Sequence, residues 1–201
     1  MALCTTSTGF IPRLARRARP GAPFGDPGFA SSTASITLSP GLICVLARGE
    51  DPAGAPATHQ HVGAAGLTVH QAWNAAAAHR LATSDAISGN ALRFWVRDAR
   101  ATLGPDAPPG VEVRGDAASW LAHPRLFAPL DAHFTHVLRP QHGLAYLTRD
   151  CRDLFVVDAA DADLRRLLDL PTVPPAAVCT RYSLGFPLLA APVAPQLTRV
   201  A

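Results

Sequence analysis

The stretch that most constrains the fold runs from Gly143 to Asp158 and reads GLAYLTRDCRDLFVVD. Residues 144–149 predict a strand, in which alternate side chains point to opposite faces of a sheet. Residues 154–157 are apolar without interruption, which is typical of a strand covered on both faces, so we expect at least one helix against it. The acidic residues of 149–153 can bond their own backbone in a tight turn. The whole stretch therefore predicts a β-hairpin.

Helices are predicted where capping residues precede apolar residues three or four positions apart. Thr68 and Gln71 have the spacing of a capping box, in which each side chain bonds the backbone amide of the other residue. Apolar residues then recur at helical spacing to about residue 82, with Trp73 as the largest. Three further helices are expected on similar grounds: Asp116 to Leu121, 126 to 138 and 162 to 169.

The segment from 91 to 103 fits both a strand and a helix. Its Phe-Trp-Val content and the Gly-Asn turn before it favour a strand at 92–97, and 111–114 reads as another short strand. Together these elements predict an α+β domain at 67–170. We expect a small, mostly antiparallel sheet of about four strands, with helices packed on one face, flanked by disordered tails.

In the segments outside this domain, apolar residues do not recur at the spacing of a strand or a helix. Residues 1–66 are rich in Gly, Pro, Ser, Thr and Ala and predict a disordered extension, with a short strand at 36–46 if the region folds; 171–201 predicts an irregular, proline-rich tail. The first 35 residues are rich in Arg and Ser/Thr and poor in acids, like an organellar transit peptide. The arginine-only basic residues favour another explanation, a GC-rich bacterial reading frame that includes sequence upstream of the native start. That explanation predicts a cytoplasmic protein.

The charge distribution argues against general nucleic-acid binding. The formal charge of +3 lies in residues 1–50, which hold five arginines and two acids, whereas residues 51–201 hold thirteen arginines and thirteen acids. The apolar run at 42–47 is far shorter than the roughly 20 residues that a membrane-spanning helix needs, and no later run approaches that length. We therefore expect a soluble chain with no membrane partner.

The histidines and Cys151 are the first candidates for chemistry. His133 and His136 would share one side of a helix, but acidic or cysteine partners at the spacing of a zinc site are missing, so no metal is predicted. Flanking arginines would favour the Cys151 thiolate, although neighbouring aspartates offset them. No recognised catalytic or phosphate-binding motif is present, so we predict no catalytic residue and no cofactor. A small enzyme or ligand-binding protein with a site near His133, His136, His142 and Cys151 is the alternative hypothesis.

Arginines at the ends and faces of the predicted strands form the main surface pattern. If these strands are neighbours, guanidinium groups and one indole would share a surface able to hold an acidic peptide, a phosphate or stacked bases. The residues of this pattern are Arg93, Trp95, Arg97, Arg114, Arg149 and Arg152. The competing interpretation is a solvated face of Arg-Asp pairs that contribute little. The leading hypothesis is a non-catalytic domain that binds a protein partner or its own copy; nucleic-acid binding is the weaker third option.

Overall fold

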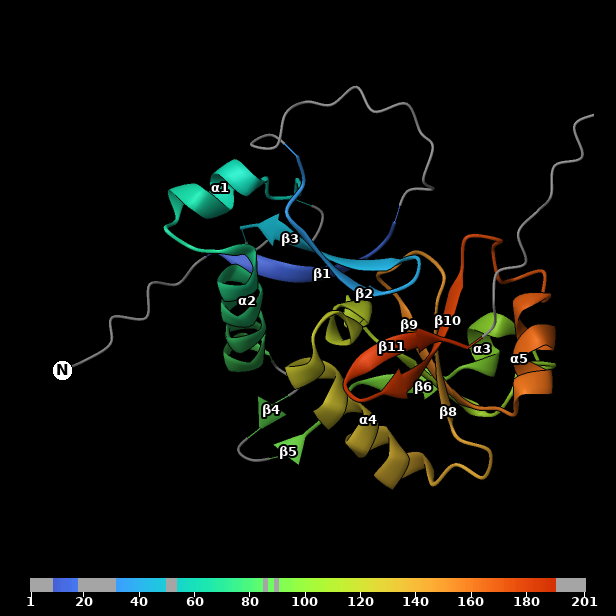
Figure 1. Ribbon diagram of the computed structural model, residues 1–201. Coiled ribbons are helices and arrows are strands. Elements are labelled where there is room, and N and C mark those ends of the chain that lie inside the picture. The colour runs from blue at the N-terminus through green and yellow to red at the C-terminus, as the bar shows by residue number, and fades with distance from the viewer. Residues whose placement is uncertain (1–8, 18–31, 50–53, 85–86, 89–90, 191–201) are drawn as a thin grey trace, which may run out of the picture.

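The structure is a computed structural model that describes residues 9–17, 32–49, 54–84, 87–88 and 91–190 (Figure 1). The strands are β1 (Phe10–Arg16), β2 (Ser35–Ser39), β3 (Leu42–Arg48), β4 (Ile87–Ser88), β5 (Ala91–Leu92), β6 (Val96–Asp98), β7 (Gly110–Val113), β8 (Leu144–Thr148), β9 (Leu154–Asp158), β10 (Val178–Ser183) and β11 (Phe186–Leu189). The helices are α1 (His59–Ala64), α2 (Val69–Thr83), α3 (Arg100–Leu103), α4 (Pro124–Leu138), α5 (Asp161–Leu168) and the 3₁₀ helix η2 (Ala117–Ala122). Within the described ranges, no helix combines the length and the apolar character that crossing a membrane requires.

The predicted hairpin forms the centre of an antiparallel sheet. β8 and β9 pair in the register that places Tyr146 opposite Val156, which confirms the hairpin. The sheet has the strand order β11-β10-β8-β9-β7-β6, so it has six strands where the sequence predicted about four. The α+β class is confirmed. The two additional strands at one edge, β10 and β11, come from the proline-rich segment after residue 170, where we expected irregular chain.

Both faces of the main sheet are covered, so the prediction of helices on one face only is wrong. On one face, Tyr146 and Val156 belong to a core shared with α2, α4, η2 and the strands β1 to β3. On the other face, Leu147 and Phe155 pack with residues of α3 and α5. Figure 1 shows these two helices next to each other beside the sheet. All four side chains are fully buried. The uninterrupted apolar run at 154–157 is therefore explained by its burial on two sides.

A second, three-stranded sheet with the order β1-β3-β2 occupies part of the segment that we predicted to be disordered. In β1 the buried residues Phe10, Pro12 and Leu14 alternate with partly buried ones, the pattern of a strand with one face on the core. The expected short strand at 36–46 is a hairpin of β2 and β3. The expectation of disorder is thus wrong for the described parts of 1–66. Residues 1–8, 18–31, 50–53 and 191–201 lie outside the described residues, and the boundaries near 67 and 170 stay predictions.

The helix predictions are confirmed with shifted ends. α2 has both bonds of its capping box: the Gln71 amide donates to the Thr68 hydroxyl over 3.2 Å, and the Thr68 amide donates to the Gln71 side chain over 2.8 Å. α4 begins at Pro124, two residues before the predicted start, with the buried His123 as its N-cap. α5 begins one residue early, and 117–122 is a 3₁₀ helix.

The ambiguous segment at 91–103 contains both kinds of element. Two short strands, β5 and β6, are separated by 93–95, and α3 follows from Arg100. The predicted continuous strand at 92–97 is therefore interrupted. This break lies beside the sheet edge, and it is where the candidate site is found.

Candidate partner-binding surface

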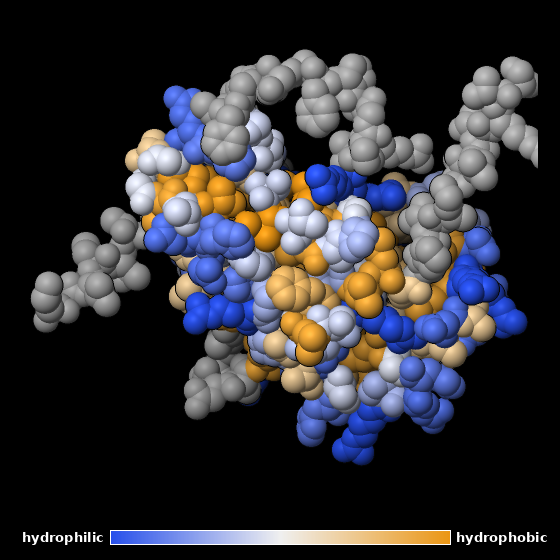
Figure 2. Space-filling view, in the orientation of Figure 1, coloured by the Kyte–Doolittle hydropathy of each residue, from blue (hydrophilic) through white to orange (hydrophobic). Residues whose placement is uncertain are grey.

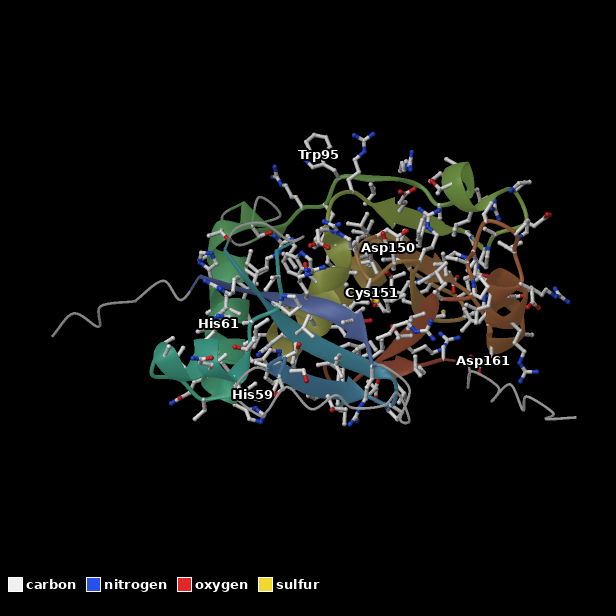
Figure 3. The ribbon with its side chains drawn as sticks, turned by 90° about the horizontal axis from the view of Figure 1, so that it is seen from above. His59, His61, Trp95, Asp150, Cys151 and Asp161 are labelled. Carbon is white, nitrogen blue, oxygen red and sulfur yellow. The ribbon has the colours of Figure 1, made fainter. Side chains whose placement is uncertain are left out.

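Trp95 lies at the free edge of the main sheet, directly before β6. The order of the strands leaves β6 with one neighbour, β7, among the described residues. The Trp95 carbonyl accepts the Arg114 amide over 2.8 Å, which fixes the backbone in register with the end of β7. The Trp95 side chain is 83% exposed and projects away from the ribbon in Figure 3. Because an indole gains much free energy from burial, its exposure is costly unless another surface covers it.

Phe94, the preceding residue, anchors this segment in the core. Its ring is stacked on Phe134 with centroids 5.3 Å apart, and it meets the edges of Trp120 and His133 at 5.2 Å and 5.3 Å. Such aromatic pairs add stabilisation beyond simple burial. The orientation of Trp95 toward solvent therefore follows from the inward orientation of its neighbour.

An apolar groove of about 580 Å³ runs between 92–96 and α4. We call it the Trp95 groove; its lining residues are Leu92, Arg93, Phe94, Trp95, Val96, Val111, His133, Phe134, Val137 and Leu138. Val96 and Val137 are 45% and 56% exposed. Among the described residues, three of the five large hydrophobic side chains that are exposed thus border one groove.

The remaining two exposed apolar side chains, Leu184 and Leu188, belong to the β10–β11 hairpin. Figure 2 shows the face that carries β11 and β2, where small groups of hydrophobic residues lie among polar ones. Scattered apolar residues of this kind are usual on protein surfaces. The Trp95 groove differs because its apolar residues line one continuous depression.

A smaller, basic depression of about 240 Å³ shares Arg93, Phe94 and Trp95 with the groove. We call it the arginine hollow, after its lining residues Arg80, Arg93 and Arg114. Asp116 also lines it, and burial raises the pKa of this carboxyl although Arg80 opposes the shift. One side of Trp95 is thus apolar, and the other carries three guanidinium groups.

The structure divides the predicted arginine pattern into two groups. Arg93, Trp95 and Arg114 line the same hollow. Arg97 instead forms two hydrogen bonds to the Glu112 carboxylate, at 2.7 Å and 2.9 Å, and these bonds hold the pKa of Glu112 below its usual value.

The other two arginines of the pattern lie at the β8–β9 turn. The Arg149 side chain donates to Asp153 over 2.5 Å and lies over the Phe155 ring, 5.1 Å from its centroid. Arg152 is exposed at the turn, and its charge acts on Asp116 of the hollow. Arg97 and Arg149 are therefore each paired with an acid of the chain.

The four residues of the enzyme hypothesis are not brought together. His133 lines the Trp95 groove, and His136 is exposed on α4. His142 lies 3.8 Å from Asp158 at one end of the hairpin, whereas Cys151 is in the turn at its other end. Burial raises the pKa of the Cys151 thiol, more than Arg16 lowers it, so the environment of this residue favours the thiol over the thiolate. No group of three potential metal ligands occurs in the described part of the chain.

A third depression, of about 530 Å³, has a lining of mixed charge near His142. The Asp158 carboxylate, which lines this depression, accepts hydrogen bonds from the backbone amides of Gln141 and His142 over 2.7 Å and 2.8 Å. These bonds hold the pKa of Asp158 low despite the opposing effect of burial, and they give the carboxylate a structural role. This depression therefore supports no particular ligand.

Arg80, Asp116 and Val137 are the important surface residues that sequence reasoning missed. They come from α2, the start of η2 and α4, so only the tertiary fold brings them beside Trp95. The Phe-Trp-Val run at 94–96 was the one local signal of this surface. Comparisons with models of protein families, with curated proteins and with solved structures found no match for this chain.

Proposed function

We propose that the chain is a non-catalytic protein-binding domain whose partner docks on the Trp95 groove and the arginine hollow. The observation that carries the proposal is the 83% exposure of Trp95 between an apolar groove and a basic hollow. Tryptophan and arginine are the residue types most enriched among those that dominate binding energy at protein interfaces. A partner that covers the indole would remove a large apolar area from water.

The position of the surface at a sheet edge also supports a protein partner. An edge strand offers unpaired backbone groups, which proteins usually protect with charges or a short strand. β6 has three residues, of which Arg97 is engaged with Glu112. An extended partner segment at this edge would lie next to both depressions.

A pull-down with the immobilised full chain tests the proposal. Trp95→Ala should abolish retention of the proteins that the unaltered chain captures from a lysate of its source organism. Leu184→Ala is the matched control, because Leu184 is 91% exposed on a different hairpin and should keep the captured set. Quantitative mass spectrometry measures the retained proteins. Equal retention by the Trp95→Ala chain would refute the proposed surface.

Sedimentation velocity separates a foreign partner from a second copy of the chain. If the surface binds its own copy, the unaltered chain should form dimers as its concentration rises, and Trp95→Ala should remain monomeric. Filter binding of a labelled oligonucleotide at two salt concentrations tests the remaining alternative. If retention of the oligonucleotide depends on salt and requires Arg93 and Arg114, the partner of this surface is a nucleic acid and the proposed protein partner is wrong.

A further inference from the structure

We infer that the partner presents a carboxylate side chain next to apolar ones, the carboxylate entering the arginine hollow and the apolar side chains lying in the Trp95 groove. The inference rests on the proposed function and specifies the chemistry that the surface recognises. The two depressions share Arg93, Phe94 and Trp95, so one short segment can reach both. The partner class is thus an acidic and apolar peptide segment.

Among the described residues, none of the three arginines of the hollow forms an ion pair, although the charge of Arg80 acts on the nearby Asp116 carboxyl. The ion pairs among the described residues involve other basic side chains, those of Arg97, His142, Arg149, Arg166 and Arg181. Arg80, Arg93 and Arg114 come from three different parts of the chain and line one depression. Like charges held together favour an anion that neutralises them, and a guanidinium matches the geometry of a carboxylate.

Arg80, which lines the hollow and also a separate depression between β1 and α2, has an unsatisfied donor. Its Nε atom is buried without a hydrogen-bond partner, whereas its Nη2 atom donates to the Asp116 carbonyl over 3.4 Å. A buried donor that has lost water and gained no acceptor destabilises the free protein. An acceptor that reached this group on binding would relieve that cost, which adds to affinity without enlarging the interface.

The apolar groove decides between a peptide and other anions. A free phosphate would use the arginines and leave the groove of about 580 Å³ empty. A nucleic acid would bring several phosphates to a hollow that has three arginines and one aspartate, and it carries no aliphatic side chain for the groove. A peptide supplies one carboxylate and apolar side chains at neighbouring positions, so it fits both depressions at once.

Selection from a phage library of random 12-residue peptides, on the immobilised full chain, provides the probe. Enriched peptides should carry Asp or Glu within a few positions of Leu, Phe or Trp. Affinity of one enriched synthetic peptide is then measured by calorimetry. Acrylamide quenching of tryptophan fluorescence shows whether the bound peptide covers Trp95. The other two tryptophans, Trp73 and Trp120, are buried and respond little.

Arg93→Gln and Arg114→Gln should each lower the affinity for the peptide about tenfold. A loss of this size is typical of one hydrogen bond to a charged group. Arg166→Gln is the matched control, since Arg166 is an exposed arginine of α5, and should leave affinity unchanged. Asp116→Asn should strengthen binding, because it removes a negative charge from the hollow. This gain of affinity cannot result from a misfolded chain.

Enriched peptides without acids, or arginine variants that bind as well as the unaltered chain, would overturn the inference. If Trp95→Ala still abolished binding in those cases, the proposed function would stand. A selection that enriches no peptide also counts against a linear acidic segment, and the pull-down then decides the proposed function alone. Displacement of the peptide by a 20-nucleotide single strand at equal concentration would favour a nucleic acid and overturn the inference.

Discussion

The β8–β9 turn and the arginine hollow are both rich in arginine, yet their arginines have opposite environments. At the turn, the Asp153 carboxylate accepts the Arg149 amide over 2.7 Å as well as its side chain. Asp150 accepts the amides of Arg152 and Asp153 over 2.8 Å and 2.9 Å. In the hollow, Arg80 keeps an unpaired buried donor. The turn is internally satisfied, whereas the hollow is not.

The two groups of arginines also differ in how far apart their residues lie in the sequence. Each acid of the turn bonds an arginine two or four residues away, which is the distance at which a tight turn joins side chains to backbone amides. The arginines of the hollow are separated by 13 and 21 residues, and the fold brings one partly buried aspartate among them. At the turn the locally spaced charges therefore stabilise the fold, whereas the arginines of the hollow, which come from distant parts of the chain, form no ion pair among the described residues.

The largest expected effect comes from removing the strand that supports the hairpin. A chain that ends at residue 170 lacks β10, whose buried residues Val178 and Thr180 pair with Thr148 and Tyr146 of β8. We expect this chain to lose its cooperative unfolding transition in urea, followed by circular dichroism. A chain that ends at residue 190 is the control and should retain the transition. Cooperative unfolding of the shorter chain would support the predicted boundary at 170.

A pair of aromatic substitutions sharpens the contrast between structure and surface. Phe155→Ala removes a fully buried ring from the hairpin and should lower the free energy of unfolding by about 3–5 kcal/mol. Trp95→Ala removes an exposed ring and should change it by less than about 0.5 kcal/mol. Urea titration of both variants gives the comparison. A large loss of stability in Trp95→Ala would mean that the indole supports the fold.

Polar substitutions test the same contrast among the charges. Asp153→Asn weakens the bonds to the Arg149 amide and side chain, so we expect a loss of about 1–3 kcal/mol. Arg114→Gln in the hollow should leave the free energy of unfolding within about 0.5 kcal/mol of the unaltered chain. The urea midpoints of the two variants measure the difference. Similar losses in both would show that the hollow is as structural as the turn.

The sequence predicted those features whose signals lie within a few residues of each other. The hairpin follows from alternation, an apolar run and a turn within residues 143–158. The capping box of Thr68 and Gln71 predicts the start of α2 for the same reason. In each case the interacting groups are neighbours in the chain, so no knowledge of the tertiary fold is needed.

Features that depend on distant pairing could not be predicted. The alternation in β1 was obscured by proline and arginine, and its partner β3 is more than 20 residues away. β10 joins β8 across about 30 residues that include β9, α5 and a proline-rich loop. The arginine hollow combines α2, the segment before β6 and the end of β7, which no local pattern connects. Of the residues that line the hollow, the sequence pattern therefore included Arg93, Trp95 and Arg114, whereas Arg80 and Asp116 could not be predicted.

The smallest expected effect concerns the pH dependence of Asp116. Burial, with a contribution from Asp150, raises the pKa of this carboxyl, and Arg80, Arg152 and Arg13 oppose the shift. A raised pKa means that the folded state prefers the protonated acid, so stability is lost as pH rises through that pKa. Asp116→Asn resembles the protonated acid at every pH. It should match the unaltered chain near pH 3.5 and be more stable at pH 7, by less than about 1 kcal/mol because solvent screens the group.

Glu112→Gln provides the control of opposite sign for this prediction. The Arg97 hydrogen bond lowers the pKa of Glu112, so its ionised form stabilises the fold above its usual pKa, and this stability is lost as pH falls through the lowered value. Glu112→Gln should therefore be less stable than the unaltered chain at pH 7, and the difference should shrink toward low pH. Urea midpoints from pH 3.5 to 7 measure both variants. Parallel pH trends in the two would mean that Asp116 is paired internally like Glu112, and one of the three positive charges of the arginine hollow would then be neutralised within the chain.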